Sequence, residues 1–263
     1  MFRLAAERGL NLHLHVDEDV ATLTVANGGA VGPVTLLSLD ATGTGGIGLT
    51  QSGDGIGGTA RITVSGAGSF LSATQSFVEA GGDGGGDLGP FQTQNGGDGI
   101  GGIAEVLINA DAASTVSAGQ LLASALGRGG DASGAENVTG GDAVGGTATL
   151  TVEGGVDAQF TAITLNASAA AGSGFSPSGT TGQTGNASAN DVTLAATNGS
   201  TIASSGFINL FAVGMGVSGE NLGTGSGGNI AVSATAGGAI TTASTLTAQA
   251  MGGSTSSGAG QSA

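Results

Sequence analysis

The sequence lacks several residue types that define common protein classes. Its 263 residues include no cysteine, tryptophan, tyrosine or lysine, only three prolines and eight phenylalanines. Without cysteine there are no disulfide bonds, no thiolate zinc sites and no thiol catalysis. The scarcity of large side chains leaves too little volume for a thick core of helices layered on a sheet. A conventional α/β enzyme is therefore not expected.

Positive charge is almost absent. Four arginines stand against 19 acidic residues, which gives a formal net charge of −15. Such a surface repels the phosphate groups of nucleic acids and anionic membranes. No stretch approaches 18 uninterrupted apolar residues, and Glu7 and Arg8 interrupt the N-terminal segment. We therefore expect no nucleic-acid partner, no direct membrane insertion and no signal peptide in this segment.

Glycine is the dominant residue, with 56 copies. Collagen requires glycine at every third position together with abundant proline, and this sequence has neither. Disorder requires low hydrophobicity, yet mean hydropathy is +0.27 and the apolar residues form short alternating runs. This pattern is typical of a folded repeat protein.

One unit recurs along the chain. Its first alternating run starts near residues 20, 59, 103, 147, 190 and 229, at separations of 39, 44, 44, 43 and 39. The run alternates apolar with polar residues, a period of two that indicates a strand with one buried face. A glycine or Asn-Gly corner follows, then a second run such as Leu37, Leu39 and Ala41. The second copy fits less well, because an inward Phe77 would place Glu79 inward too.

A stretch of glycine-rich sequence, roughly 13 to 20 residues long, follows each second run and is longer than an ordinary connection. We expect these stretches to protrude as Gly/Asp-rich loops. A unit of short strands cannot bury its own apolar face, but stacked units can. The prediction is an all-β protein, a parallel β-helix (β-solenoid) of about six coils over residues 20–263, with residues 1–19 as part of a preceding coil. At about 4.8 Å per coil, six coils span about 29 Å. An α-helical solenoid is the disfavoured alternative, because β-branched residues are in phase with the repeat.

Three segments carry a resemblance to a known family. Gly28–Ala41, Gly199–Ala212 and Gly237–Ala250 share the cadence Gly-x-Ile-spacer-Leu-x-Leu/Ala-x-Ala. This cadence resembles the filamentous-haemagglutinin-like repeats of large bacterial exoproteins, the two-partner-secretion and autotransporter adhesins. The resemblance implies a right-handed β-helix on a secreted or cell-surface rod that is commonly used for adhesion. The family's secretion domain and outer-membrane barrel are not found, so we expect a fragment of a longer repeat protein.

Acidic residues beside glycines are the main candidate site. The set comprises Asp54, Asp83, Asp87, Asp98, Asp131 and Asp142. Asp54, Asp98 and Asp142 are 44 residues apart, so stacked coils would align them in a column. Carboxylates in flexible glycine loops suit Ca²⁺. The alternative is that these acids only keep the rod soluble.

Other chemistries have weaker support. His13 and His15 lie two apart on one strand face and could share a metal with nearby acids, but terminal histidines usually face solvent. Phosphate binding at the glycine loops is opposed by the aspartates and the lack of lysine. Lyase or hydrolase activity lacks basic and sugar-stacking residues, and outward threonines that could bind ice are interrupted by Arg61 and Glu105.

The sequence therefore predicts a non-catalytic structural or adhesive rod segment of a secreted or surface exoprotein, without a cofactor. Its expected partners are a host or abiotic surface, or other copies of the rod. The alternative function is a calcium-ordered module of an extracellular matrix or surface layer.

Overall fold

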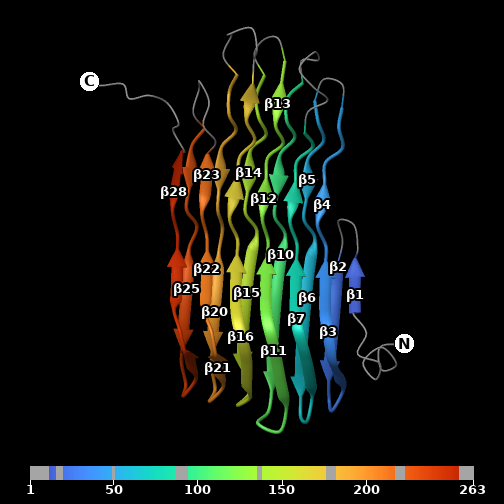
Figure 1. The fold of residues 1–263 in the computed structure, drawn as a ribbon, viewed down its shortest axis with the longest axis vertical. Helices are drawn as coiled ribbons and strands as arrows, with labels where there is room; N and C mark the ends of the chain where they lie inside the picture. Colours follow the sequence, from blue (N-terminus) through green and yellow to red (C-terminus); the bar gives the residue numbers. More distant parts are fainter. Residues whose placement is uncertain are drawn as a thin grey trace, which may run out of the picture.

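The computed structural model describes residues 12–15, 20–48, 51–86, 94–134, 138–175, 182–216 and 223–254, without the side chains of 12–15 and 254. Within these residues the chain forms 28 β-strands and no helix (Figure 1). That part of the chain accordingly has no helix that could cross a membrane. Every pairing between named strands is parallel, which confirms the predicted stacking of short strands in parallel sheets.

Sheet I collects the first alternating run of each repeat. Its strands stack in the order of the sequence, and Val20 aligns with Thr59, Thr59 with Ile103, and Ile103 with Thr147. They are β2 (Val20–Ala26), β6 (Thr59–Gly66), β10 (Ile103–Ala110), β15 (Thr147–Glu153), β20 (Val192–Ala196) and β25 (Ile230–Ala234). This in-register stacking follows from the alternation, because a slip of one residue would turn every apolar side chain outward.

Sheet II collects the second runs and lies opposite sheet I. In the last two repeats two short strands take the place of one. The strands are β1 (Leu12–His15), β3 (Ala30–Asp40), β7 (Phe70–Glu79), β11 (Thr115–Ser124), β16 (Asp157–Asn166), β21 (Thr201–Ser204), β22 (Ile208–Phe211), β26 (Ala239–Thr242) and β27 (Leu246–Gln249). The apolar core lies between the two sheets and consists of ladders of Ala, Val, Leu and Ile.

The inward residues of the second runs are buried as expected in most repeats. Leu37 and Leu39 are fully buried, whereas Leu246 in the last repeat is 44 % exposed. The difference arises because β27 has a paired strand on one side alone within the described residues. In the second repeat Val78 and Ala80 face the core, and Phe77 and Glu79 do not. The inward Phe77 that the sequence suggested is therefore wrong.

The resulting register places Ser76 in the core. Its side chain is 1 % exposed and lies in register with Leu37 and Leu121 of the neighbouring strands. Its hydroxyl has no hydrogen-bond partner among the residues that the structure describes. We expect Ser76→Ala to raise the free energy of unfolding by about 1 kcal/mol, because an unsatisfied buried hydroxyl is destabilising. Denaturant unfolding measures this, with the outward Ser72→Ala as control; an equal effect of both variants would contradict the explanation.

Corners between sheets I and II use glycine, asparagine and hydrogen-bonded polar side chains. At the first corner Asn27 and Gly28 both have positive φ, of 50° and 78°, the conformation that a tight Asn-Gly turn requires. At another corner the Ser114 hydroxyl and the Gly68 amide donate hydrogen bonds to the Asp111 carboxylate. These bonds lower the pKa of Asp111, the Ser114 bond having the largest effect.

The glycine-rich stretches extend beyond the apolar body (Figure 1), and within their described parts short segments pair as parallel strands instead of standing as separate loops. Sheet III contains β4 (Gly43–Thr44), β8 (Gly82–Asp83), β12 (Gly127–Arg128), β17 (Ala169–Ala170), β23 (Gly214–Gly216) and β28 (Gly252–Ser254). Sheet IV contains β5 (Gly55–Ile56), β9 (Gly99–Ile100), β14 (Ala143–Val144), β19 (Ala187–Ser188) and β24 (Gly225–Ser226). Near the tip β13 (Ala132–Ser133) pairs with β18 (Gly174–Phe175). We call this part of the molecule the glycine arm.

The two layers of the glycine arm touch through their backbones. The amide of Gly85 donates to the oxygen of Gly53 at 2.9 Å, that of Gly97 to Gly85 at 3.0 Å, and that of Gly130 to Gly97 at 2.8 Å. The same zigzag continues through Gly141, Gly172 and Gly185. A Cβ atom at Gly97 would lie 2.0 Å from the oxygen of Gly53. Glycine is therefore required here by close approach of two backbones, which explains its abundance.

Candidate functional site

The three aspartates that the sequence aligns at 44-residue intervals do form a column. The Oδ1 atom of Asp54 accepts the backbone amide of Asp98 at 2.9 Å, and Oδ1 of Asp98 accepts that of Asp142 at 2.8 Å. The column continues, because Oδ1 of Asp142 accepts the amide of Asn186 at 2.6 Å and that of Asn186 accepts the amide of Thr224 at 3.1 Å. Each side chain thus binds the backbone of the next repeat.

This arrangement gives the column a structural role. Asn186 occupies the same position as the aspartates and makes the same bond, so the bond needs the oxygen and not the charge. Similar bonds lie elsewhere in the glycine arm, where Oδ1 of Asp131 accepts both the amide and the hydroxyl of Ser173. In sheet IV of the glycine arm the strands are only two residues long. Beside them, a side-chain oxygen accepts the backbone amide of the next repeat, as a backbone carbonyl does within a longer strand.

Calcium binding by the aspartates stays a prediction. In the described part of the chain no three His, Asp or Glu side chains gather closely enough to hold a metal ion. Asp83 lies in β8 of sheet III, in the other layer of the glycine arm from the column beside sheet IV. Asp87 lies outside the described residues, and for His13 and His15 only the backbone of β1 is described.

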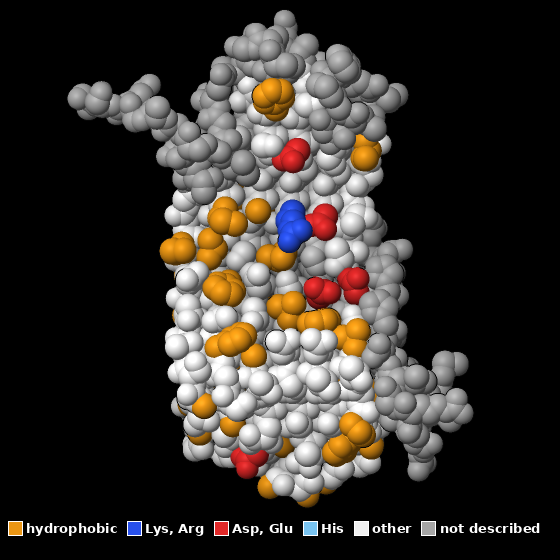
Figure 2. Space-filling model, viewed as in Figure 1, with side chains coloured by type: hydrophobic (Ala, Val, Ile, Leu, Met, Phe, Trp, Pro, Cys, Tyr) orange, Lys and Arg blue, Asp and Glu red, His pale blue; other side chains and the backbone are white. Residues whose placement is uncertain are grey.

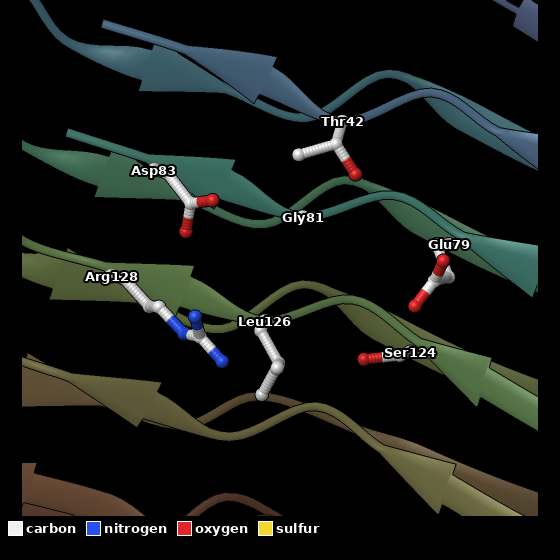
Figure 3. A pocket seen from close by; sticks show the side chains of 7 residues that line it. All are labelled: Thr42, Glu79, Gly81, Asp83, Ser124, Leu126 and Arg128. Atoms are coloured by element: carbon white, nitrogen blue, oxygen red, sulfur yellow. The ribbon is translucent and has the colours of Figure 1, made fainter. Parts of the chain in front are cut away.

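A separate group of polar side chains lines a shallow groove on the outer surface where sheet II meets sheet III. The groove has a volume of about 140 Å³. Its lining residues are Thr42, Glu79, Gly81, Asp83, Ser124, Leu126 and Arg128. In Figure 3 Asp83 and Arg128 lie at one end, Glu79 and Ser124 at the other, and Gly81 and Leu126 between them.

Strand alternation explains this arrangement. The chain from β7 into β8 presents Glu79, Gly81 and Asp83 at every second position. The neighbouring chain from β11 into β12 presents Ser124, Leu126 and Arg128 in register, so Glu79 aligns with Ser124 and Asp83 with Arg128. The hollow exists because Gly81 has no side chain where neighbouring repeats carry Thr42 and Leu126.

A second hollow adjoins the first. It has a volume of about 480 Å³ and is lined by Asp83, Gly84, Gly86, Arg128, Gly129, Gly130 and Asp131. Asp83 and Arg128 are common to both hollows and therefore stand between them. Figure 2 shows this face of the molecule, where the basic side chain in view lies among acidic ones, with apolar side chains alongside.

The sequence identifies Asp83 and Asp131 as candidate residues, but it does not show that both line one hollow together with Arg128. The available signal was the period of two running from Glu79 through Asp83, which continues the outward face of β7 into the glycine arm. The other described arginine, Arg61, lies on sheet I and forms an ion pair of 2.5 Å with Glu105 in the neighbouring strand.

Comparison of the chain with known protein families, with curated proteins and with solved structures gives no match in any of the three.

Proposed function

We propose that this chain is a structural, non-catalytic rod segment of a secreted or cell-surface exoprotein, folded as a right-handed β-helix of six coils. The observation that carries the proposal is the continuous parallel register of sheet I from β2 to β25. Polar side chains such as Asp54 and Asp98 are engaged in bonds between repeats, a use that favours rigidity over reaction chemistry. The resemblance to haemagglutinin-like repeats supports a location outside the cell and a role in adhesion.

The partners of such a rod are a host or abiotic surface, or further copies of the rod. The net charge of −15 opposes binding to nucleic acid. The test is an immunoblot of surface, medium and cytosolic fractions of the source cell, with an antibody against residues 59–190. We expect a band far above 24.4 kDa in the surface or medium fraction. A band near 24.4 kDa confined to the cytosol would overturn the proposal.

The alternative function, a calcium-ordered extracellular module, is favoured by one observation, the alignment of Asp54, Asp98 and Asp142. Under this alternative, calcium raises the melting temperature more than magnesium at equal ionic strength. The magnesium control is needed because any divalent cation screens a chain of net charge −15.

The matched variant for this test is the double substitution Asp98→Asn and Asp142→Asn. Asparagine keeps the Oδ1 acceptor, as Asn186 shows, so the fold is expected to persist while the charge is removed. Under the rod proposal we expect equal melting temperatures in calcium and magnesium for both proteins. A calcium-specific increase that the double variant loses would establish the alternative instead.

A further inference from the structure

We propose that the groove at Asp83 and Arg128 binds a neutral, hydroxyl-rich ligand, namely successive sugar units of an uncharged glycan. The proposal deepens the proposed function, since it names a ligand class for the rod. It is carried by the two adjoining hollows, by the acid and the base that line both of them, and by a glycine at the floor of the groove that backbone packing does not require.

The charged groups select the class of ligand. Asp83 can only accept hydrogen bonds when ionised, and Arg128 can only donate them. They lie in register on neighbouring strands, with Asp83 half-buried and Arg128 exposed. A hydroxyl group both donates and accepts, so neighbouring hydroxyls of a sugar satisfy both residues. The half-buried side chain of Thr42 adds a further polar partner along the groove, whereas Ser124 is only 6 % exposed.

An anionic ligand fits this surface poorly, and a cationic one matches only the acids. An anionic polymer would meet Glu79, Asp83 and Asp131 around a single arginine, on a chain of net charge −15. A cationic peptide would be attracted by these three acids but repelled by the exposed Arg128, which lines both hollows. A neutral ligand with hydroxyl groups provides partners for the acids and for the arginine alike, and it gains apolar contact between one sugar ring and Leu126.

The size and shape of the site indicate an extended ligand. A hollow of about 140 Å³ is smaller than the roughly 300–1,000 Å³ of pockets that enclose a whole small molecule. It suits one unit of a longer chain. Because Asp83 and Arg128 also line the second hollow of about 480 Å³, the next unit can lie there, over Gly84 and Gly129.

Gly81 supplies independent support. A Cβ atom at Gly81 would lie 3.5 Å from the nearest atoms, an ordinary van der Waals contact, whereas one at the adjacent Gly82 would lie 2.0 Å from a backbone oxygen. Backbone packing therefore requires glycine at position 82 and not at position 81. Glycine at position 81 has one structural consequence, which is that the groove is open.

The experiment is native affinity electrophoresis of the whole chain in gels that contain dextran, mannan, galactan or mixed-linkage β-glucan, with alginate as an anionic counterpart. We expect at least one neutral polysaccharide to retard the chain. Asp83→Ala and Arg128→Ala are each expected to weaken this binding by roughly tenfold or more, because each loses a charge-assisted hydrogen bond.

Two further variants keep the test decisive. Gly81→Leu fills the groove with the residue of the neighbouring strand, without a backbone clash, and is expected to abolish retardation while the melting temperature is unchanged. Arg61→Ala removes an arginine on sheet I and is expected to bind like the original chain. Failure of all four neutral polymers, stronger retardation by alginate, or binding that survives Gly81→Leu and Arg128→Ala would overturn the proposal. The rod function would then still be decided separately by cell fractionation.

Discussion

Replacement of Gly130 by alanine is expected to lower the free energy of unfolding by about 3 kcal/mol, the upper part of the usual range for overpacked sites. A Cβ atom at this position would lie 1.9 Å from the backbone oxygen of Gly85 and 2.6 Å from its carbon. The obstacle is the backbone of Gly84 and Gly85, so there is no side chain that could rotate away to relieve the clash. The amide of Gly130 also donates to Gly97, and the shift that relieves the clash would stretch this bond.

The matched control is Gly46→Ala in the same arm. A Cβ atom at Gly46 would meet no atom within 4 Å among the described residues other than its immediate chain neighbours, so alanine fits there. We expect a change of less than about 0.5 kcal/mol, or slight stabilisation from the reduced entropy of the unfolded chain. Thermal unfolding followed by circular dichroism measures both variants, and Gly130→Ala should melt roughly 6–12 °C lower than Gly46→Ala. Equal melting temperatures would mean that the two layers of the arm are not in backbone contact.

The glycine arm also marks the limit of sequence prediction. Hydrophobic periodicity locates sheets I and II, because Val, Leu and Ile recur at every second position. In the arm the same rule gives the wrong face: Ile56 is 54 % exposed and Val144 is 41 % exposed, whereas Gly55 and Gly145 beside them are buried. Glycine lies inside because the two layers leave no room for a side chain. The signal that could have located these strands is glycine itself at every second position, as at the buried Gly97 and Gly99.

The two candidate sites also differ in how far they could be predicted from the sequence. The column of Asp54, Asp98 and Asp142 could be predicted, because equal spacing in a stacked repeat places residues one above another. Its hydrogen bonds to the next repeat could not, since they depend on the side-chain direction relative to a neighbouring amide. The groove could not be predicted either. The groove is open because position 81 is glycine although a larger side chain would fit there. The sequence does not distinguish Gly81 from Gly82, where a Cβ atom would clash with the backbone.

The core ladders give the second large effect. Leu165→Ala is expected to lower the free energy of unfolding by about 3 kcal/mol, within the range for fully buried leucines. Leu165 lies in the middle of sheet II, is fully buried and aligns with Ala123 on one side and Leu210 on the other. With alanine already at position 123, a second alanine leaves a cavity that spans two repeats. Neighbouring strands cannot close it, because their separation is fixed by hydrogen bonds along the stack.

Leu246→Ala is the matched control, since it makes the same substitution on the same sheet. Leu246 is 44 % exposed and has a paired strand on one side, β22. About half of its apolar surface is already in contact with water, so we expect a loss of about 1 kcal/mol. Denaturant unfolding of both variants gives the comparison. A difference of about 2 kcal/mol would show that burial between two neighbouring repeats, and not membership of a strand, determines what each leucine contributes. Equal losses would contradict the packed ladder and leave the backbone bonds of the stack as the main source of its stability.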